Sequence, residues 1–172
     1  MTGQARTRVG IIGAGNIAAI AQLPTLVKRD DVELAALVSR RLDPGPLMRR
    51  WGFGAAYGTV EDMLTAENLD AVFVLTPRSE HAHAVDACLR RDVDVFCEKP
   101  LAPSADEAER LADLADEHGR ILMVDFNRSV EYWIDKVRVS HTHTRRTHAQ
   151  QVHCDLPSWL TSCHNRLGKA MS

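Results

Sequence analysis

Short apolar runs alternate with helical patterns along most of the chain. The runs are nearly continuous in apolar character and rich in β-branched residues, as strands buried on both faces of a parallel sheet must be. They span residues 8–13, 32–39, 69–75, 93–97 and 120–126. The pattern therefore predicts five buried, parallel strands.

Capping residues mark the ends of the intervening helices. Ser104 and Glu107 form a capping box ahead of an apolar pattern with helical spacing, and Gly119 suits the C-terminal cap of that helix. Thr59 with Asp62 opens another helix in the same way.

Two further helices are predicted with less regular starts. Ser79 stands ahead of the helical pattern that follows the third apolar run. The Pro-Gly-Pro sequence at 44–46 delays the helix after the second run to near Leu47. Strands and helices in this alternation close by right-handed crossovers, so we expect an α/β fold of the Rossmann type, with a doubly wound parallel sheet.

A glycine pattern follows the first predicted strand. In VGIIGAGNIA, Gly13, Gly15 and Ala18 make a G-x-G-x-x-A motif that opens a helix at Asn16 and Ile17. Gly13 permits a tight turn, Gly15 lets the backbone approach a pyrophosphate, and Ala18 lets helix and strand pack closely. The same pattern also occurs as a tight turn that binds nothing. Its place between strand and helix favours a dinucleotide site, with Gly13, Gly15, Asn16 and Ile17 as cofactor contacts.

The end of the second strand bears on which dinucleotide binds. An acidic residue at this point would hold the two hydroxyls of the adenosine ribose. The chain instead has Ser39, Arg40 and Arg41. A hydroxyl and guanidinium groups match a 2′-phosphate, which favours NADP and makes Ser39 and Arg40 cofactor contacts. The alternative is NAD, with the arginines at the start of a solvated loop.

Four stretches resemble a known family. VGIIGAGNIA, LDAVFVLTPRSEHAHAVDACL, VDVFCEKPLAPS and MVDFNR, in this order and spacing, are similar to the N-terminal domain of the Gfo/Idh/MocA oxidoreductases. The resemblance covers about residues 7–134. Its most specific element is Glu98-Lys99-Pro100 at the end of the fourth predicted strand, reinforced by Thr76-Pro77 and His81.

The resemblance implies a catalytic lysine. Strand ends at the carboxyl edge of such a sheet face the ligand crevice, so Lys99 is expected near the nicotinamide and the alcohol carbon that is oxidised. An ammonium there can stabilise an alkoxide or relay its proton. The competing interpretation is an exposed Glu-Lys pair in a loop. The resemblance also implies cofactor contacts from Thr76, Pro77, His81, Glu98, Lys99 and Asn127.

Charge and cysteine content limit the partners. A net charge of -2 over 172 residues gives no reason to expect nucleic acid or an anionic membrane. No apolar stretch approaches the length of a membrane span. The four cysteines have no regular spacing, which favours reduced thiols and a cytoplasmic protein. These features are compatible with a monomer and with a homo-oligomer.

The pattern changes near residue 134. Residues 1–134 are expected to form the NAD(P)-binding domain, and 135–172 an irregular tail with six Lys or Arg residues against two Asp residues. The tail resembles a truncated or frame-disrupted sequence more than an evolved domain. No metal site is expected, because the spacings of the candidate ligands match no standard zinc frame. These candidates are His141, His143, His148, His153, Cys154, Cys163 and His164.

Three functions remain in competition. The first is an NADP-linked oxidoreductase acting on the CH–OH group of a sugar or polyol, as the resemblance implies. The second is a cofactor-binding module without useful turnover, since family members carry a second domain that contacts the substrate. The third is a regulatory protein that reports the nucleotide ratio. Whether the chain by itself is an enzyme stays open.

Overall fold

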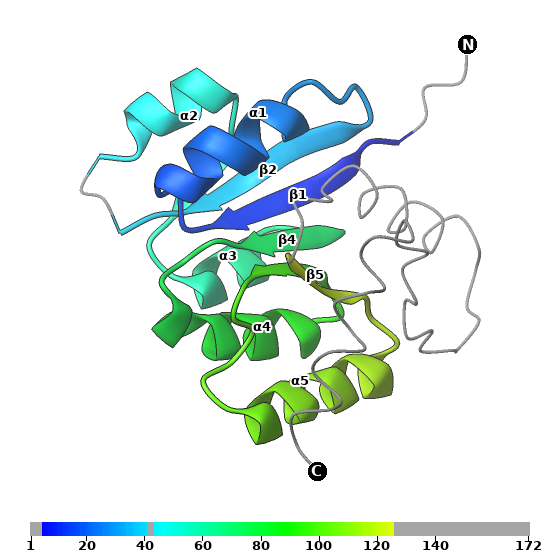
Figure 1. Ribbon diagram of the computed structural model, residues 1–172. Coiled ribbons are helices and arrows are strands. Elements are labelled where there is room, and N and C mark those ends of the chain that lie inside the picture. The colour runs from blue at the N-terminus through cyan, green and yellow to red at the C-terminus, as the bar shows by residue number, and fades with distance from the viewer. Residues whose placement is uncertain (1–4, 41–42, 126–172) are drawn as a thin grey trace, which may run out of the picture.

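Six parallel strands form one sheet in the order β3-β2-β1-β4-β5-β6 (Figure 1). The computed structural model describes residues 5–40 and 43–125. The strands are β1 (Thr7–Ile12), β2 (Val32–Val38), β3 (Ala55–Tyr57), β4 (Ala71–Val74), β5 (Asp94–Glu98) and β6 (Leu122–Asp125). Chain order reverses between β1 and β4, which makes this a doubly wound Rossmann sheet and confirms the predicted fold class.

Helices cover both faces of the sheet (Figure 1). One face carries the π-helical segment η1 (Ala18–Gln22), α1 (Leu23–Leu26) and α2 (Gly45–Trp51). The other carries α3 (Val60–Ala66), α4 (His81–Leu89) and α5 (Ala105–His118). A 3-10 turn, η2 (Arg78–Glu80), connects β4 to α4.

The central strands are buried on both faces, as their continuous apolar runs predict. Phe73 of β4 and Phe96 of β5 are fully buried, with ring centroids 4.7 Å apart on the α1 side. Met63 and Leu111 are fully buried on the opposite side. Burying a side chain of this size contributes roughly 1.5–3 kcal/mol. The two apolar layers hold the strand ends, and the loops that leave them, in fixed positions.

Side-chain caps set the starts of α3 and α5 as predicted. Thr59 Oγ1 accepts a hydrogen bond of 3.1 Å from the backbone N–H of Asp62. Ser104 Oγ accepts one of 3.3 Å from the N–H of Glu107. Gly119 ends α5 with a φ of +62°, the left-handed conformation that glycine adopts without strain.

Three details differ from the prediction. The structure has one strand more than predicted. This additional strand, β3, was not expected, because three half-buried residues at a sheet edge carry no periodic signal. The second helix begins at Gly45 and not near Leu47, since proline fits the first turn, where its missing N–H is not needed. Ser79 lies inside η2, and no side chain among the described residues caps α4, which begins after Glu80.

The helix after the glycine turn contains a short π-helical segment. The N–H of Leu23 donates to the carbonyl of Ala18, five residues back. Pro24 lacks an N–H, so no ordinary i to i−4 bond can form there. Gln22 lies in this segment and is buried, with only 1% of the residue exposed.

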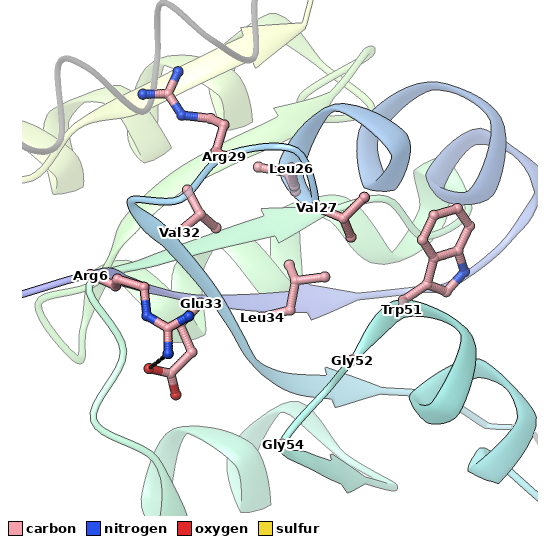
Figure 2. A pocket seen from close by; sticks show the side chains of 10 residues that line it. All are labelled: Arg6, Leu26, Val27, Arg29, Val32, Glu33, Leu34, Trp51, Gly52 and Gly54. Carbon is pink, nitrogen blue, oxygen red and sulfur yellow. Dashed lines mark ion pairs between the residues drawn. The ribbon is translucent and has the colours of Figure 1, made fainter.

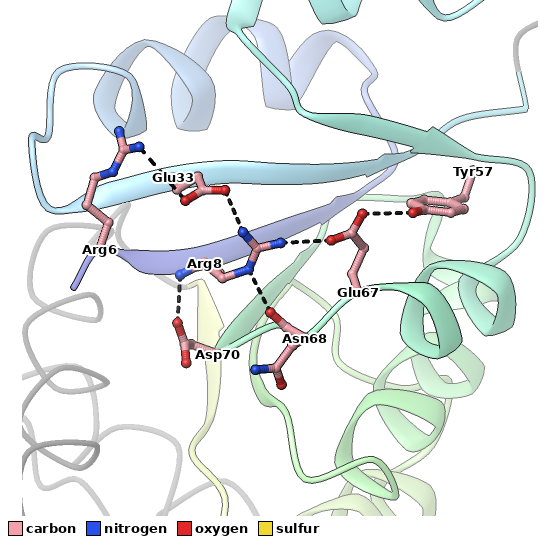
Figure 3. A network of polar contacts seen from close by, with 7 residues as sticks. All are labelled: Arg6, Arg8, Glu33, Tyr57, Glu67, Asn68 and Asp70. Carbon is pink, nitrogen blue, oxygen red and sulfur yellow. Dashed lines mark hydrogen bonds and ion pairs between the residues drawn. The ribbon is translucent and has the colours of Figure 1, made fainter.

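An arginine network ties the amino ends of the strands together (Figure 3). The guanidinium of Arg8 donates to Glu33 Oε1 at 2.6 Å, Glu67 Oε2 at 2.8 Å and the Asn68 carbonyl at 2.9 Å. The backbone N–H of Arg8 donates to Asp70 Oδ2 at 2.7 Å. The network therefore joins β1 to β2 and to the segment before β4, at the edge opposite the glycine turn.

Two cysteines are buried as free thiols, Cys88 of α4 and Cys97 of β5. Burial raises the pKa of both, and that of Cys97 to about 12. Thiolate chemistry is therefore suppressed at both positions. Separately, among the described helices none is long and apolar enough to cross a membrane.

Candidate functional site

The glycine turn lies at the carboxyl end of β1, where chain order reverses. Gly13 has a φ of +92°, and its N–H donates to the carbonyl of Val38 at 3.1 Å. A Cβ at Gly13 would lie 3.0 Å from the carbonyl carbon and oxygen of Leu75 and from Thr76 Cγ2. A side chain there would meet fixed backbone in a left-handed conformation, so both conformation and space require glycine.

Gly15 meets the opposite situation. No described atom lies within 4 Å of where its Cβ would stand, and the residue is exposed. Asn16 and Ile17 are exposed beside it, while Ala18 is fully buried against the sheet. The space in front of Gly15 is therefore open to a ligand, and the first backbone N–H groups of the helix lie next to it.

Ser39 and Arg40 follow β2 at the same edge of the sheet. The N–H of Ser39 donates to the Tyr57 carbonyl at 3.1 Å, which fixes its backbone beside β3. The guanidinium of Arg40 makes an ion pair with Glu80 of η2. Arg41 lies outside the described residues. A hydroxyl and an exposed guanidinium thus stand one strand away from the glycine turn.

His81 connects the segments that follow β4 and β5. Its Nδ1 lies 2.7 Å from the Pro100 carbonyl oxygen, and its Nε2 lies 2.7 Å from the Thr76 carbonyl oxygen. The residue is only 2% exposed. Thr76 and Pro77 leave β4 beside it, and Thr76 Oγ1 is buried without a hydrogen-bond partner among the described residues. His81 therefore positions two loops at the carboxyl edge through its own ring nitrogens.

Replacing His81 should destabilise the domain markedly. His81→Ala leaves two partly buried carbonyl groups, those of Thr76 and Pro100, without this partner, and each group left unsatisfied costs about 1–3 kcal/mol. We expect the free energy of unfolding, measured by urea denaturation, to fall by about 2–4 kcal/mol. The control is His83→Ala in the same helix, because His83 is exposed and, within the described part of the chain, pairs only with Glu61. Equal losses for the two variants would contradict the role given to His81.

Glu98 ends β5, and Lys99 follows it as an exposed residue. Across the sheet, Glu98 is in register with Asp125 of β6. Asp125 Oδ2 accepts a hydrogen bond of 2.8 Å from Gln22 Nε2, and both of these side chains are buried. A lysine, two carboxyl groups and a buried amide therefore gather where β5 and β6 end. The peptide bond between Lys99 and Pro100 is cis.

The environment of Glu98 favours its protonated form. Partial burial and the charge of Asp125 raise the pKa of Glu98, while the backbone N–H and charge of Lys99 oppose the shift. An Asp125 hydrogen bond adds to the rise in pKa. The folded domain therefore holds this proton more tightly than the unfolded chain does.

A raised carboxyl pKa implies that stability falls as pH rises. The contribution of Glu98 is fully present below the unfolded value of about 4.3 and is lost as pH rises through the folded pKa. Glu98→Gln cannot ionise. The stability of this variant relative to the parent should therefore be greater at neutral pH than at about pH 4. Urea unfolding across this range tests the expectation, and a difference that does not vary with pH would contradict it.

The structure thus brings the predicted residues to one edge of the sheet. All those within the described residues lie at or just after the carboxyl ends of β1, β2, β4 and β5: Gly13, Gly15, Asn16, Ile17, Ser39, Arg40, Thr76, Pro77, His81, Glu98 and Lys99. Asn127 and the tail histidines lie outside the described residues. Sequence reasoning missed Gln22, Glu80 and Asp125, whose partners are 103, 40 and 103 positions away in the chain.

A cavity of about 290 Å³ lies elsewhere, between α1, the end of α2 and the first half of β2 (Figure 2). Leu26, Leu34 and Trp51 line it, and Arg6 pairs with Glu33 at its rim at 3.9 Å. Its walls contain none of the predicted site residues. We place the site at the carboxyl edge because the polar groups and the open glycine turn are there. Within residues 5–40 and 43–125, no three potential metal ligands cluster.

Known proteins share this domain. The family model described as an oxidoreductase family with an NAD-binding Rossmann fold, GFO_IDH_MocA, matches residues 7–126. D-xylose 1-dehydrogenase (NADP(+)) 2 of Haloferax volcanii is 36% identical over 118 residues, which cover 68% of this chain and 36% of that protein. Myo-inositol 2-dehydrogenase of Thermotoga maritima is 31% identical over 132 residues, 76% of this chain and 39% of that protein.

A solved structure agrees with these relatives. The 3-ketoreductase KijD10 of Actinomadura kijaniata, in complex with TDP-benzene and NADP, matches with a TM-score of 0.66 and 37% identity, over 70% of this chain and 38% of its own. The chain thus spans little more than a third of the length of the proteins it matches. Fold, glycine turn and sequence together show that the chain belongs to the Gfo/Idh/MocA oxidoreductase family and contains its NAD-binding Rossmann domain.

Proposed function

We propose that the domain binds NADP(H) along the carboxyl edge of its sheet and serves hydride transfer at a CH–OH carbon of a sugar or polyol. The observation that carries the proposal is the gathering of the open glycine turn, Arg40 and Lys99 at the point where chain order reverses. In open α/β sheets, ligands bind in the crevice at this point.

The proposal assigns the pyrophosphate to the glycine turn. The open space before Gly15 and the N–H groups at the start of the helix match an anion held by backbone donors. Asn16 and Ile17 flank that space. Gly13 keeps the turn tight against Leu75 and so leaves the crevice free.

NADP is favoured over NAD on the evidence of Ser39 and Arg40. A guanidinium can hold a 2′-phosphate by paired, charge-assisted hydrogen bonds. NAD has only uncharged hydroxyls at this position, so it has no anion for the guanidinium to bind. Two similar proteins support this choice: the Haloferax volcanii relative is named for NADP(+), and the KijD10 structure is a complex with NADP. NAD remains the alternative, because the family model is described by NAD binding.

The chemistry assigned to Lys99 follows from its charge and place. The cofactor, when bound, accepts or gives the hydride. Lys99 is exposed just after β5, so its ammonium can stabilise the alkoxide that forms as the hydroxyl proton leaves, or relay that proton by releasing one of its own protons to water and taking up the hydroxyl proton. Glu98 and Pro100 hold the lysine in place, and Glu98 also faces the nicotinamide ribose in this proposal.

The substrate class rests on the similar proteins, whose names give xylose, myo-inositol and a 3-ketoreductase. Xylose and myo-inositol are polyhydroxylated compounds, and a ketoreductase interconverts a carbonyl and a CH–OH group. Residues 1–134 are proposed as the cofactor domain and 135–172 as an irregular tail. The alternative function is a cofactor-binding module that turns over no substrate at a useful rate. A cytoplasmic setting fits the buried free thiols of Cys88 and Cys97.

Cofactor preference can be measured by thermal shift. A ligand at about a hundred times its dissociation constant stabilises a protein by about 2.7 kcal/mol. We expect NADPH to raise the melting temperature at lower concentration than NADH does. Arg40→Asp should reverse the order, since attraction for the 2′-phosphate becomes repulsion. Equal shifts with both cofactors, unchanged in Arg40→Asp, would refute the NADP assignment.

A further inference from the structure

An ion pair crosses the proposed crevice. Arg40 follows β2, and its partner Glu80 belongs to η2, which follows β4. In the sheet, β2 and β4 flank β1 on either side. The pair therefore joins the two loops that border the glycine turn. Both partners reach solvent, since the side chain of Arg40 is 71% exposed and that of Glu80 is 37% exposed.

Glu80 binds the guanidinium of Arg40, the same group that would bind a 2′-phosphate. A carboxylate and a phosphate bind guanidinium through the same N–H donors. Arg40 Nη2 donates to Glu80 Oε1, so this donor is occupied in the free domain.

We propose that Glu80 is a cofactor-selectivity residue that competes with the 2′-phosphate for Arg40. The inference rests on the proposed binding of NADP by Arg40. In the free domain Glu80 occupies a donor of Arg40, and a 2′-phosphorylated nucleotide competes with the carboxylate for the guanidinium. A nucleotide without that phosphate leaves the pair intact. Glu80 thus lowers the affinity for NADP(H) but not for NAD(H). The difference in affinity between the two cofactors is reduced as a result.

The size of the effect is limited by solvent. Exposed ion pairs contribute little because water and salt screen them, and their measured strengths correspond to roughly a 1.5- to 5-fold change in an equilibrium constant. Removing Glu80 should therefore tighten binding by about two- to fivefold. Increasing salt should reduce this gain, because screening weakens the competing pair.

The test uses adenosine 2′,5′-bisphosphate and 5′-AMP as probes of the adenosine half, titrated calorimetrically into the 172-residue chain. Glu80→Gln should tighten the bisphosphate about two- to fivefold and leave 5′-AMP unchanged. Glu61→Gln is the matched control, because Glu61 is an exposed acid paired with His83, and its loss changes the net charge equally. This control should change neither affinity.

A double-mutant cycle separates competition from simple repulsion. Arg40→Gln should weaken the bisphosphate, and adding Glu80→Gln to that variant should give little further change. A full gain from Glu80→Gln without Arg40 would mean direct repulsion and would overturn the proposal. If Arg40→Gln weakens the bisphosphate but Glu80→Gln does not tighten it, only the role of Glu80 fails. If Arg40→Gln changes nothing, the NADP assignment fails, and the role of Glu80 with it.

Discussion

A chain carrying Gly15→Val should fold as the parent does and lose most of its affinity for NADPH. The added side chain has room in the free domain, because no described atom lies within 4 Å of the Cβ position. The same atoms would occupy the space assigned to the pyrophosphate. Two hydrogen bonds to a charged group contribute about 1.5–3 kcal/mol each, so we expect the dissociation constant to rise at least about a hundredfold.

Two further glycine variants make this result interpretable. Gly58→Val, after β3, also points into open space and should leave binding and stability near those of the parent. Gly13→Val should instead destabilise the fold by roughly 1–3 kcal/mol or more, because it forces a β-branched residue to a φ of +92° against backbone. Fluorescence titration and urea unfolding distinguish the two effects. Undiminished NADPH binding by Gly15→Val would remove the pyrophosphate from this turn.

Lys99→Ala should lower turnover steeply without weakening cofactor binding. Proton transfer by a positioned side chain typically contributes about 10²- to 10⁴-fold to a rate. In a protein that joins this domain to a substrate-binding domain of the family, we expect kcat to fall by at least about a hundredfold. The dissociation constant for NADPH should change by less than about twofold, since one exposed charge contributes little to binding.

Lys28→Ala is the control, because Lys28 is exposed at the end of α1, outside the group of residues assigned to the site. The assay follows NADPH formation with a panel of inositols and sugars. The 172-residue chain itself should bind cofactor and show negligible turnover, since a misplaced substrate alone costs about a hundredfold in rate. Robust turnover by this chain that depends on Lys99 would restore the complete-enzyme hypothesis.

The main elements of the fold could be predicted because their signals are local. The buried strands are continuous apolar runs, and Thr59 and Ser104 cap helices through residues three positions away. β3 escaped prediction because its three half-buried residues become a strand only by pairing with β2. Proline usually indicates the end of a helix. In the structure, however, Pro24 follows the π-helical segment within a helix, and Pro46 lies in the first turn of α2.

In the site, too, local sequence motifs could be predicted and contacts between distant residues could not. The glycine motif and the Glu98-Lys99-Pro100 sequence are contiguous, so their pattern is visible in the chain. The Gln22–Asp125 and Arg40–Glu80 contacts join positions far apart, and no local pattern indicates them. His81 was expected as a cofactor contact. In the structure its ring nitrogens contact two backbone carbonyls, and any cofactor contact remains a prediction.

The central claim is that the dinucleotide lies along the carboxyl edge of the sheet, across the glycine turn. The most direct test is to titrate NADPH into the isotope-labelled 172-residue chain and follow the backbone amide signals by NMR. The claim predicts that the largest chemical-shift changes fall at Gly13, Gly15, Ser39, Thr76 and Lys99. Changes gathered instead around the cavity lined by Leu34, Trp51 and Gly54, with the glycine turn unaffected, would contradict it.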